Sequence, residues 1–358
     1  MFCHILSRFI CLTLIECFGK IYFCKFLQKW TRRGWRRVIS AENLTKTYVL
    51  RTKKGLFTRN VKKIQALQGV SFEIQPGELV GYIGPNGAGK STTVKILSGI
   101  LQPDAGNCRV LGLCPWQQRM KHAGNIGVVF GQRSQLWWDL PVEDSFLLLR
   151  DIYKVPQEEF RPTMKELTEE LDLGNLLDRP VRQLSLGQRM RCELAASLLH
   201  RPSVLFLDEP TIGLDAGTRL AVREFIRRIN REQGVTMILT THDMADIESL
   251  CSRVMLIGGG KKLLDGDISL LRKGREKRKL VCTLDRPPLQ VELAEPGLEI
   301  SLKQNRLEVQ FSPENTPAAR LIGEISEKYG ILDMTLECTP IDRVVADMYA
   351  ELAGGGEA

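Results

Sequence analysis

The sequence predicts an α/β fold built around a largely parallel sheet, followed by a second, smaller domain. From Ile39 onward, short β-rich runs alternate with helix-like segments. Most residues of these runs are apolar, which is typical of strands that helices cover on both faces. A chain of 358 residues with 43% hydrophobic residues can bury the core of one large domain and one small domain.

Six apolar runs predict the strands of the first domain. They are residues 70–74, 79–84, 126–130, 204–208, 235–241 and 253–257. Helical patterns occupy 90–100, 187–200 and 218–233, and the pattern of 141–180 predicts a mainly helical insert. The basic segment RTKKGLFTRNVKK, residues 51–63, is interpreted as a solvated hairpin or loop and not as a binding patch, because charge runs are usually solvated.

A charged, non-periodic stretch, RKGREKRK, separates two predicted domains. Residues 38–271 form the first domain, 272–279 a basic linker, and 280–358 a small α+β accessory domain. The accessory domain contains four strand-like runs and helical patterns near 315–329 and 341–352. It holds no concentrated group of polar side chains, so we expect it to serve regulation or assembly and not chemistry.

The positive charge of the chain comes almost entirely from its first 37 residues. They carry eight Lys or Arg and one Glu, which is +7 of the total of +8, so the remaining chain has no general nucleic-acid signal. The longest uncharged run there, Phe9–Ile15, is far below the roughly 20 residues of a membrane-spanning helix. The segment is either an interfacial helix or lies upstream of a true start at Val38, and we expect the second.

Cysteine and histidine give no metal-site spacing. Four of the ten cysteines fall in the first 24 residues, the other six are widely spaced, and the four histidines are scattered. This usage indicates a reduced, cytosolic chain with incidental thiols.

The strongest motif is a glycine-rich phosphate loop, GPNGAGKSTT. It consists of Gly84, Pro85, Asn86, Gly87, Ala88, Gly89, Lys90, Ser91 and Thr92. The motif follows a predicted strand and opens a predicted helix, so backbone N–H groups and the helix N-terminus can hold phosphate oxygens. We expect Lys90 to reach the β- and γ-phosphates and the Ser91 hydroxyl to bind Mg²⁺.

Acidic and basic side chains follow two other apolar strands. Asp208 ends the predicted strand VLFLD and Glu209 follows it directly, while His242 follows the predicted strand VTMILTT. Ligands bind at the carboxyl ends of parallel strands, so these residues are expected at the edge that carries the phosphate loop. Asp208 suits Mg²⁺ binding, Glu209 suits proton abstraction from water, and His242 suits a γ-phosphate contact.

In these motifs, and over residues 39–267, the chain resembles the nucleotide-binding subunit of an ATP-binding cassette (ABC) transporter. The resemblance implies a P-loop NTPase fold of the ABC type: a RecA-like core sheet, an antiparallel β subdomain and a helical subdomain. It also implies roles for further residues. The signature loop corresponds to LSLGQ, with Ser185, Gly187 and Gln188; the glutamine loop to Gln132, a Mg²⁺ or water ligand; the D-loop aspartate to Asp215; the switch histidine to His242; and the adenine-stacking aromatic to Tyr48.

The resemblance implies two cassettes, identical or related, that close head to tail over two ATP molecules. It further implies a separate integral membrane permease of the export type, to which the subunit binds at the cytoplasmic face of the membrane. Trp137 and Trp138, just after Gln132, are either core aromatics or anchors for that permease. The substrate is not indicated by any residue.

Two other classes of function compete with this interpretation. A soluble ABC-type ATPase acting on nucleic acid or ribosomes fits less well, since the chain has one phosphate loop and no long heptad run. Nucleic acid is therefore not expected as a partner. A catalytically dead cassette is disfavoured because Lys90, Asp208, Glu209 and His242 are all present.

One position departs from the family pattern, which usually has glycine where Leu186 stands. The groups expected to meet phosphate are the Ser185 hydroxyl, the Gly187 N–H and the helix N-terminus, and all three remain. Leu186 is therefore interpreted as a tolerated variant, and Leu186→Gly is expected to change the activity little, provided that the backbone there does not need a positive φ.

Overall fold

The structure is a computed structural model of the full chain, which describes residues 37–53, 59–131, 133–272, 277–338 and 341–354. The chain divides into two compact units, the first ending at Gly266 and the second beginning at Asp267. The sequence-based boundary at residue 271 falls five residues later. The two units are described separately.

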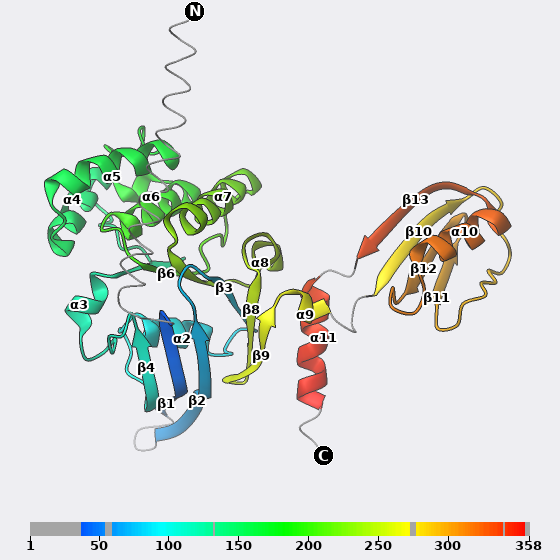
Figure 1. Ribbon diagram of the computed structural model, residues 1–358, viewed down its shortest axis with the longest axis horizontal. Coiled ribbons are helices and arrows are strands. Elements are labelled where there is room, and N and C mark those ends of the chain that lie inside the picture. Colours follow the sequence, from blue (N-terminus) through cyan, green and yellow to red (C-terminus); the bar gives the residue numbers. More distant parts are fainter. Residues whose placement is uncertain (1–36, 54–58, 132, 273–276, 339–340, 355–358) are drawn as a thin grey trace, which may run out of the picture. The chain divides into compact units, whose positions relative to one another are not determined.

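A six-stranded sheet forms the centre of the first unit (Figure 1). Its strands, in order across the sheet, are β5 (Ile126–Phe130), β6 (Val204–Asp208), β7 (Thr236–Thr240), β3 (Leu79–Ile83), β8 (Arg253–Gly258) and β9 (Lys261–Asp267). The pairings from β5 to β8 are all parallel. Every residue of β3 and β7 is buried, which confirms the prediction from their uninterrupted apolar runs.

Helices connect these strands in the alternation that the sequence predicts. They are α2 (Lys90–Leu97), α3 (Arg119–Ala123), α4 (Val142–Tyr153), α5 (Gln157–Glu170), the 3₁₀ turn η1 (Val181–Gln183), α6 (Leu186–Leu198), α7 (Ala216–Gln233) and α8 (Met244–Leu250). Figure 1 shows α4 to α7 on the other side of the six-stranded sheet from β1 and β2. The presence of α4 and α5 confirms that residues 141–180 are mainly helical.

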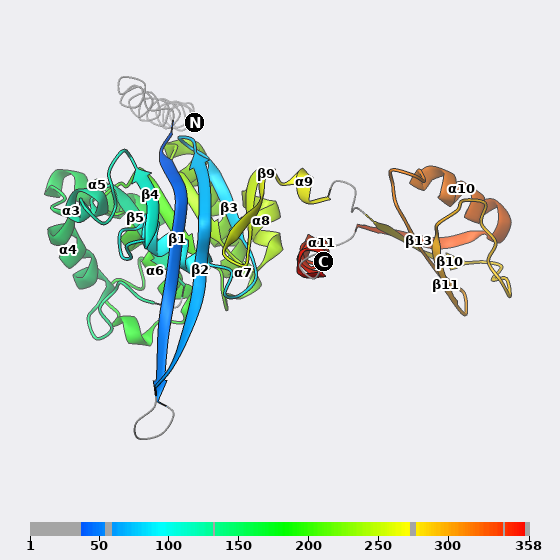
Figure 2. The ribbon, with the colours of Figure 1, turned by 90° about the horizontal axis from the view of Figure 1, so that it is seen from below.

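A second, antiparallel sheet has the order β2-β1-β4. Its strands are β1 (Ile39–Lys53), β2 (Arg59–Ile74) and β4 (Ala105–Val110). Strands β1 and β2 form a hairpin that extends beyond β4 (Figure 2), with pairs running out to Lys53 and Arg59. This confirms the hairpin expected for residues 51–63, of which 54–58 lie outside the described residues.

The core of the first unit joins both sheets to helix α2. Buried side chains of β1, β2 and β4 meet those of β3, β6 and α2 in one cluster. Phe72 and Tyr82 illustrate the junction, with ring centroids 5.9 Å apart. The Tyr82 hydroxyl lies 3.0 Å from Thr93 Oγ1, and Thr93 Oγ1 donates to the Gly89 carbonyl at 3.1 Å. This packing holds the start of α2 at the carboxyl end of β3.

The second unit contains a four-stranded antiparallel sheet of order β11-β12-β10-β13. Its elements are α9 (Ser269–Arg272), β10 (Arg278–Leu284), β11 (Glu299–Lys303), β12 (Arg306–Phe311), α10 (Ala318–Tyr329), β13 (Ile331–Cys338) and α11 (Ile341–Gly354). Leu321 and Ile325 of α10 are buried against the sheet, and α11 contacts α9.

The basic linker expected over residues 272–279 is shorter in the structure, because strand β10 already begins at Arg278. Lys279 pairs with Gln310 and Glu337 in the neighbouring strands, and its Nζ lies 2.7 Å from the Glu308 carboxylate. Interstrand pairing and this ion pair bring the charged residues into the sheet.

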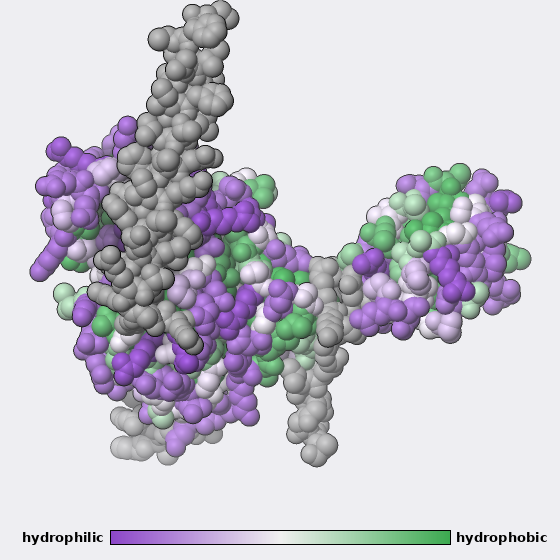
Figure 3. Space-filling model, viewed as in Figure 1, coloured by the Kyte–Doolittle hydropathy of each residue, from purple (hydrophilic) through white to green (hydrophobic). Residues whose placement is uncertain are grey.

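The visible face of each unit is mostly hydrophilic (Figure 3). Over the residues described, none of the helices has both the length and the apolar character needed to cross a membrane.

Candidate functional site

The phosphate loop, residues Gly84–Thr92, connects β3 to α2 and is shaped by glycine. Gly87 and Gly89 have φ values of +81° and +106°, a region that residues with a Cβ rarely adopt. A Cβ on Gly89 would lie 2.4 Å from the Ala66 carbonyl oxygen, so a side chain cannot be accommodated there. Gly89 is also the N-cap residue of α2, and no side chain occupies the N–H groups of this helix terminus.

Lys90 is folded over this loop. Its Nζ donates to the carbonyl oxygens of Gly84 at 2.6 Å and Pro85 at 3.2 Å, and only 7% of the residue is exposed. Burial lowers the pKa of Lys90, while the charges of Glu209 and Asp208 oppose that shift. An ammonium group held among carbonyls at a helix N-terminus is suited to bind an anionic oxygen.

Asp208 joins the ends of three elements. Its carboxylate accepts hydrogen bonds from the Thr240 hydroxyl of β7 and, at 3.4 Å, from the Ser91 hydroxyl of α2. The Asp208 carbonyl accepts from the N–H of Gly131 at 2.8 Å. Ser91 and Asp208, placed 117 residues apart in the sequence, are therefore neighbours at one sheet edge, as the sequence predicts.

Glu209 and His242 face each other at the same edge. His242 Nδ1 lies 3.4 Å from Glu209 Oε1, and the side chains are 59% and 20% exposed. Glu209 has a φ of +57°, and its N–H donates to the Thr240 carbonyl at 2.9 Å. A non-glycine residue in the left-handed region is uncommon and occurs often at functional sites. The edge thus carries an acid and an imidazole in contact.

Tyr48 lies on β1 beside the phosphate loop. Its hydroxyl is 3.4 Å from Thr92 Oγ1, and the residue is half-buried. Strand β1 thus places an aromatic ring next to the start of α2, where the resemblance expects adenine stacking.

We expect Tyr48→Ala to weaken ATP binding about tenfold, because stacking on an aromatic ring contributes about 1–3 kcal/mol. Tyr48→Phe should bind ATP within twofold of the wild-type chain, because it keeps the ring and loses only a long contact. Titration of a fluorescent ATP analogue measures both. Equal losses in the two variants would show that the hydroxyl, and not the ring, is the contributing group.

The signature loop, residues Ser185–Gln188, opens helix α6. Ser185 is the N-cap residue: its hydroxyl accepts from the Gln188 N–H at 3.3 Å, and the Gln188 side chain accepts from the Ser185 N–H at 2.9 Å. This capping box fixes the turn. Among the hydrogen bonds of the described residues, none joins this loop to the phosphate loop.

Asp215 caps the following long helix, α7. It accepts from the Thr218 N–H at 2.9 Å and the Thr218 hydroxyl at 2.7 Å, and these hydrogen bonds lower the pKa of its carboxyl. Gln132, the remaining site residue expected from the sequence, lies outside the described residues. Its neighbour Gly131 contacts Asp208, as described above.

Sequence reasoning missed an ion-pair network behind the site. Arg219 of α7 forms an ion pair with Asp243 at 2.7 Å, and Arg223 of α7 forms one with the fully buried Asp246 at 2.5 Å. Asp246 also accepts from Thr211, and Arg219 donates to the Leu214 carbonyl at 3.3 Å. The network ties the loop before Asp215 to the segment after His242. The i, i+4 spacing of the arginines was the available signal.

A second missed residue, Glu193, anchors the segment after Gln132 to α6. Its buried carboxylate accepts from the Ser134 hydroxyl and from the Gln135 N–H at 3.2 Å, and burial raises its pKa. Trp137 and Trp138 follow and are 39% and 52% exposed, so they are not core aromatics.

The donor set fits Mg²⁺ bound together with phosphates. Within the described part of the chain, no group of three or more His, Cys, Asp or Glu side chains lies close enough to hold a metal ion. The adjacent Ser91 hydroxyl and Asp208 carboxylate supply two oxygen ligands, and Mg²⁺ commonly takes one or two protein ligands plus substrate phosphates and water.

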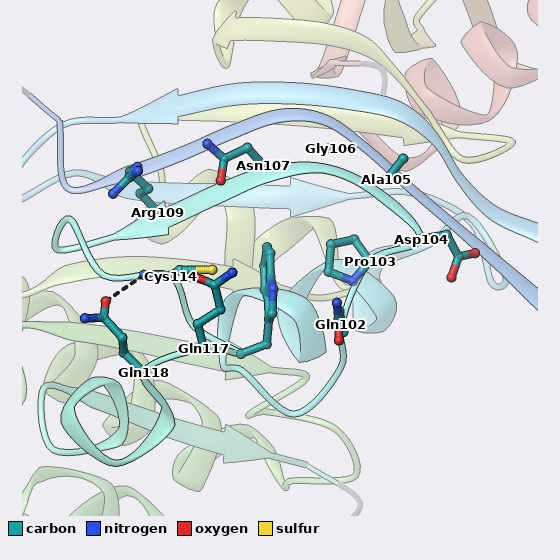
Figure 4. A pocket seen from close by; sticks show the side chains of 11 residues that line it. Gln102, Pro103, Asp104, Ala105, Gly106, Asn107, Arg109, Cys114, Gln117 and Gln118 are labelled. Atoms are coloured by element: carbon teal, nitrogen blue, oxygen red, sulfur yellow. Dashed lines mark hydrogen bonds between the residues drawn. The ribbon is translucent and has the colours of Figure 1, made fainter.

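A separate depression lies between β4 and the segment that leads to α3 (Figure 4). Its lining includes Gln102, Asn107, Arg109, Cys114 and Gln118. The Cys114 N–H donates to the Gln118 side chain at 3.3 Å within the turn that forms one side of this depression. None of the expected site residues contributes to this lining.

Comparison with known proteins agrees with this architecture. The family described as ABC transporter matches residues 67–212. The chain is 40% identical over 200 residues to the Nod factor export ATP-binding protein I of Burkholderia thailandensis, covering 56% of this chain and 65% of that protein. It is 30% identical over 224 residues to the ABC transporter ATP-binding protein NatA of Bacillus subtilis, covering 63% and 91%. The match thus spans just under two thirds of the Burkholderia relative.

Solved structures resemble the first unit. The dimeric, post-hydrolysis ATP-binding cassette MJ0796 bound to ADP and Pi superposes with a TM-score of 0.55 at 27% identity, covering 64% of this chain and 98% of that one. Another dimeric structure of MJ0796, a bacterial ABC transporter cassette, gives 0.56 at 28% identity, with the same two coverages. The chain belongs to the family of ABC transporter ATP-binding proteins, and its fold is the ABC-type P-loop NTPase cassette.

Proposed function

We propose that this chain binds and hydrolyses ATP and thereby powers a separate membrane permease, as the ATP-binding subunit of an ABC exporter. The observation that carries the proposal is the convergence on one sheet edge of Lys90, the Ser91–Asp208 pair and the Glu209–His242 pair. These side chains come from three segments that the parallel order of β3, β7 and β6 brings together.

Each residue at this edge has a role in the proposed reaction. The phosphate loop and Lys90 hold the phosphates, and Ser91, Asp208 and Gln132 hold Mg²⁺, which supplies charge neutralisation when bound. Glu209 accepts a proton from water as the water oxygen bonds to the γ-phosphorus and ADP leaves with the electron pair of the broken P–O bond. His242, in contact with Glu209, contacts the γ-phosphate side of the site.

The complete site requires a second cassette. Ser185, Gly187 and Gln188 form the capped N-terminus of α6, and Gly187 packs against Thr218 of α7 in the same chain. Among the described residues, no hydrogen bond joins them to the phosphate loop of their own chain. We propose that these residues close over the ATP of a partner cassette, and that Asp215 lies at the same interface. The dimeric structure of the cassette MJ0796 supports this arrangement.

The permease and the direction of transport rest on two observations. Relatives are named for Nod factor export and linearmycin resistance. Trp137 and Trp138 are exposed beside the anchored segment after Gln132, which suits contact with a permease helix. The subunit would then sit at the cytoplasmic face of the membrane, bound to the permease.

The test is purification of the full chain from its host membranes. We expect an integral membrane protein to copurify and ATPase activity to change when that protein is present. Activity that responds to nucleic acid or ribosomes, with no membrane partner, would favour the soluble-ATPase alternative.

The second unit should be dispensable for the ATP site. A chain truncated after Gly266 should bind ATP within about twofold of the full chain, because the phosphate loop, Tyr48 and Asp208 all lie in the first unit, which has its own core. Circular dichroism checks that the truncated chain is folded, and nucleotide titration then measures its affinity for ATP. Loss of ATP binding in a folded truncation would contradict this assignment.

A further inference from the structure

We propose that Leu186 is a positioning residue whose side chain fixes the signature loop against the loop that carries Asp215 in the same chain. The inference rests on the proposed function and concerns residues Ile212–Thr218, here called the Asp215 loop. It assigns a role to the one signature-loop residue that departs from the family pattern.

The first contact joins Leu186 to Gly213. A Cβ built on Gly213 would lie 2.8 Å from Leu186 Cδ2, so the leucine side chain occupies the space that glycine leaves open. Gly213 also has a φ of +69°, which disfavours any larger residue. A large residue on one loop thus fits against an obligatory small residue on the other.

The second contact joins Gly187 to Thr218. A Cβ on Gly187 would lie 2.9 Å from Thr218 Cγ2 and 3.2 Å from Thr218 Oγ1, so the α6 backbone packs directly on this side chain. Thr218 in turn donates two hydrogen bonds to Asp215. The signature loop therefore touches the Asp215 loop two residues before Asp215 and three residues after it.

The backbone at Leu186 does not require glycine. Leu186 is the first residue of α6 and does not have a positive φ, so leucine and glycine can present the same N–H groups. The difference between them is the side chain, which is half-buried. The contact with Gly213 therefore revises the expectation that Leu186→Gly changes the activity little.

The consequence is a coupled pair of loops. In the proposed dimer the signature loop closes over the partner's ATP, and Asp215 lies at the interface. Without the leucine, Ser185 and Asp215 lose a fixed spacing, and small misplacements of binding groups have large effects on rate. The nucleotide-binding residues of the chain's own phosphate loop are untouched by this change.

The experiment compares Leu186→Gly, Leu186→Met and wild type as full chains. We expect Leu186→Gly to lower kcat about tenfold, within the range that misplaced binding groups produce. Its affinity for a fluorescent ATP analogue should stay within twofold, because that binding uses its own phosphate loop. Leu186→Met should retain kcat within twofold, since methionine conserves volume and reach. Leu148→Gly, in the interior of α4, controls for glycine in a helix and should retain kcat.

Each outcome decides the proposal. A kcat for Leu186→Gly within twofold of wild type would overturn it, as would a parallel fall in ATP affinity. So would an equal loss in Leu186→Met or in Leu148→Gly. A wild-type chain without any ATPase activity would instead refute the proposed function on which this inference rests.

Discussion

Replacing Glu209 by Gln should lower the ATPase rate about a thousandfold, within the range that general bases contribute, and leave ATP bound. Glutamine keeps the size and shape of the side chain but cannot accept the proton of the attacking water. The φ of +57° at this position and the contact with His242 hold the side chain in place, so the amide should occupy the same position. Phosphate release under saturating ATP measures the rate.

The same variant should also accumulate a dimer in the presence of ATP. If hydrolysis opens the closed pair of cassettes, a chain that binds ATP and cannot hydrolyse it remains closed. Size-exclusion chromatography with and without ATP shows this. Glu224→Gln is the matched control, because its carboxyl lies on α7 with 73% of the side chain exposed, and it should hydrolyse ATP normally. Unchanged turnover in Glu209→Gln would refute the general-base assignment.

Residues at the ends of strands could be predicted because their placement follows from local pattern and sheet topology. Lys90, Asp208 and His242 each follow an apolar run, and parallel strands bring such positions to one edge. This rule alone predicts that Asp208 and Ser91 lie close together, as their hydrogen bond shows. The order β6-β7-β3 then decided which of these residues became neighbours.

Contacts between helices could not be predicted in the same way. Arg223 lies on α7 and Asp246 on α8. The sequence of either helix alone does not indicate that the Arg223 guanidinium meets the buried Asp246 carboxylate at 2.5 Å. The contact of Leu186 with Gly213 is of the same kind. The sequence showed a leucine in place of glycine, but only the packing of α6 against the Asp215 loop shows what that side chain touches.

The buried ion pair carries a physical constraint that the sequence did not suggest. Asp246 is fully buried, so its charge must be compensated, and Arg223 with the Thr211 and Thr241 hydroxyls supplies the partners. Thr211 precedes the Asp215 loop and Thr241 precedes His242. The position of the histidine therefore depends on the same network as the loop expected at the dimer interface, which gives the two regions a common support.

Replacing Lys90 by Ala should weaken ATP binding about a hundredfold, since charge-assisted hydrogen bonds to phosphate contribute about 1.5–3 kcal/mol each. Lys90 is buried beneath a loop whose carbonyl oxygens it now contacts, and it carries the cationic charge of that loop. Alanine also removes the donor that these carbonyls share, but both lie in a loop whose shape is set by Gly87 and Gly89. We therefore expect the fold to persist and the affinity to fall.

Lys95→Ala is the matched control for this effect, because Lys95 lies in the last turn of the same helix, α2, beyond the phosphate loop. It should bind ATP within twofold of wild type. Titration at two ionic strengths adds a second criterion: the affinity of wild type should fall more with salt than that of Lys90→Ala, since one cationic contact is missing from the variant. Equal ATP affinity in Lys90→Ala and wild type would refute the assignment of the phosphate loop, because no other buried cation of the described residues lies at this sheet edge.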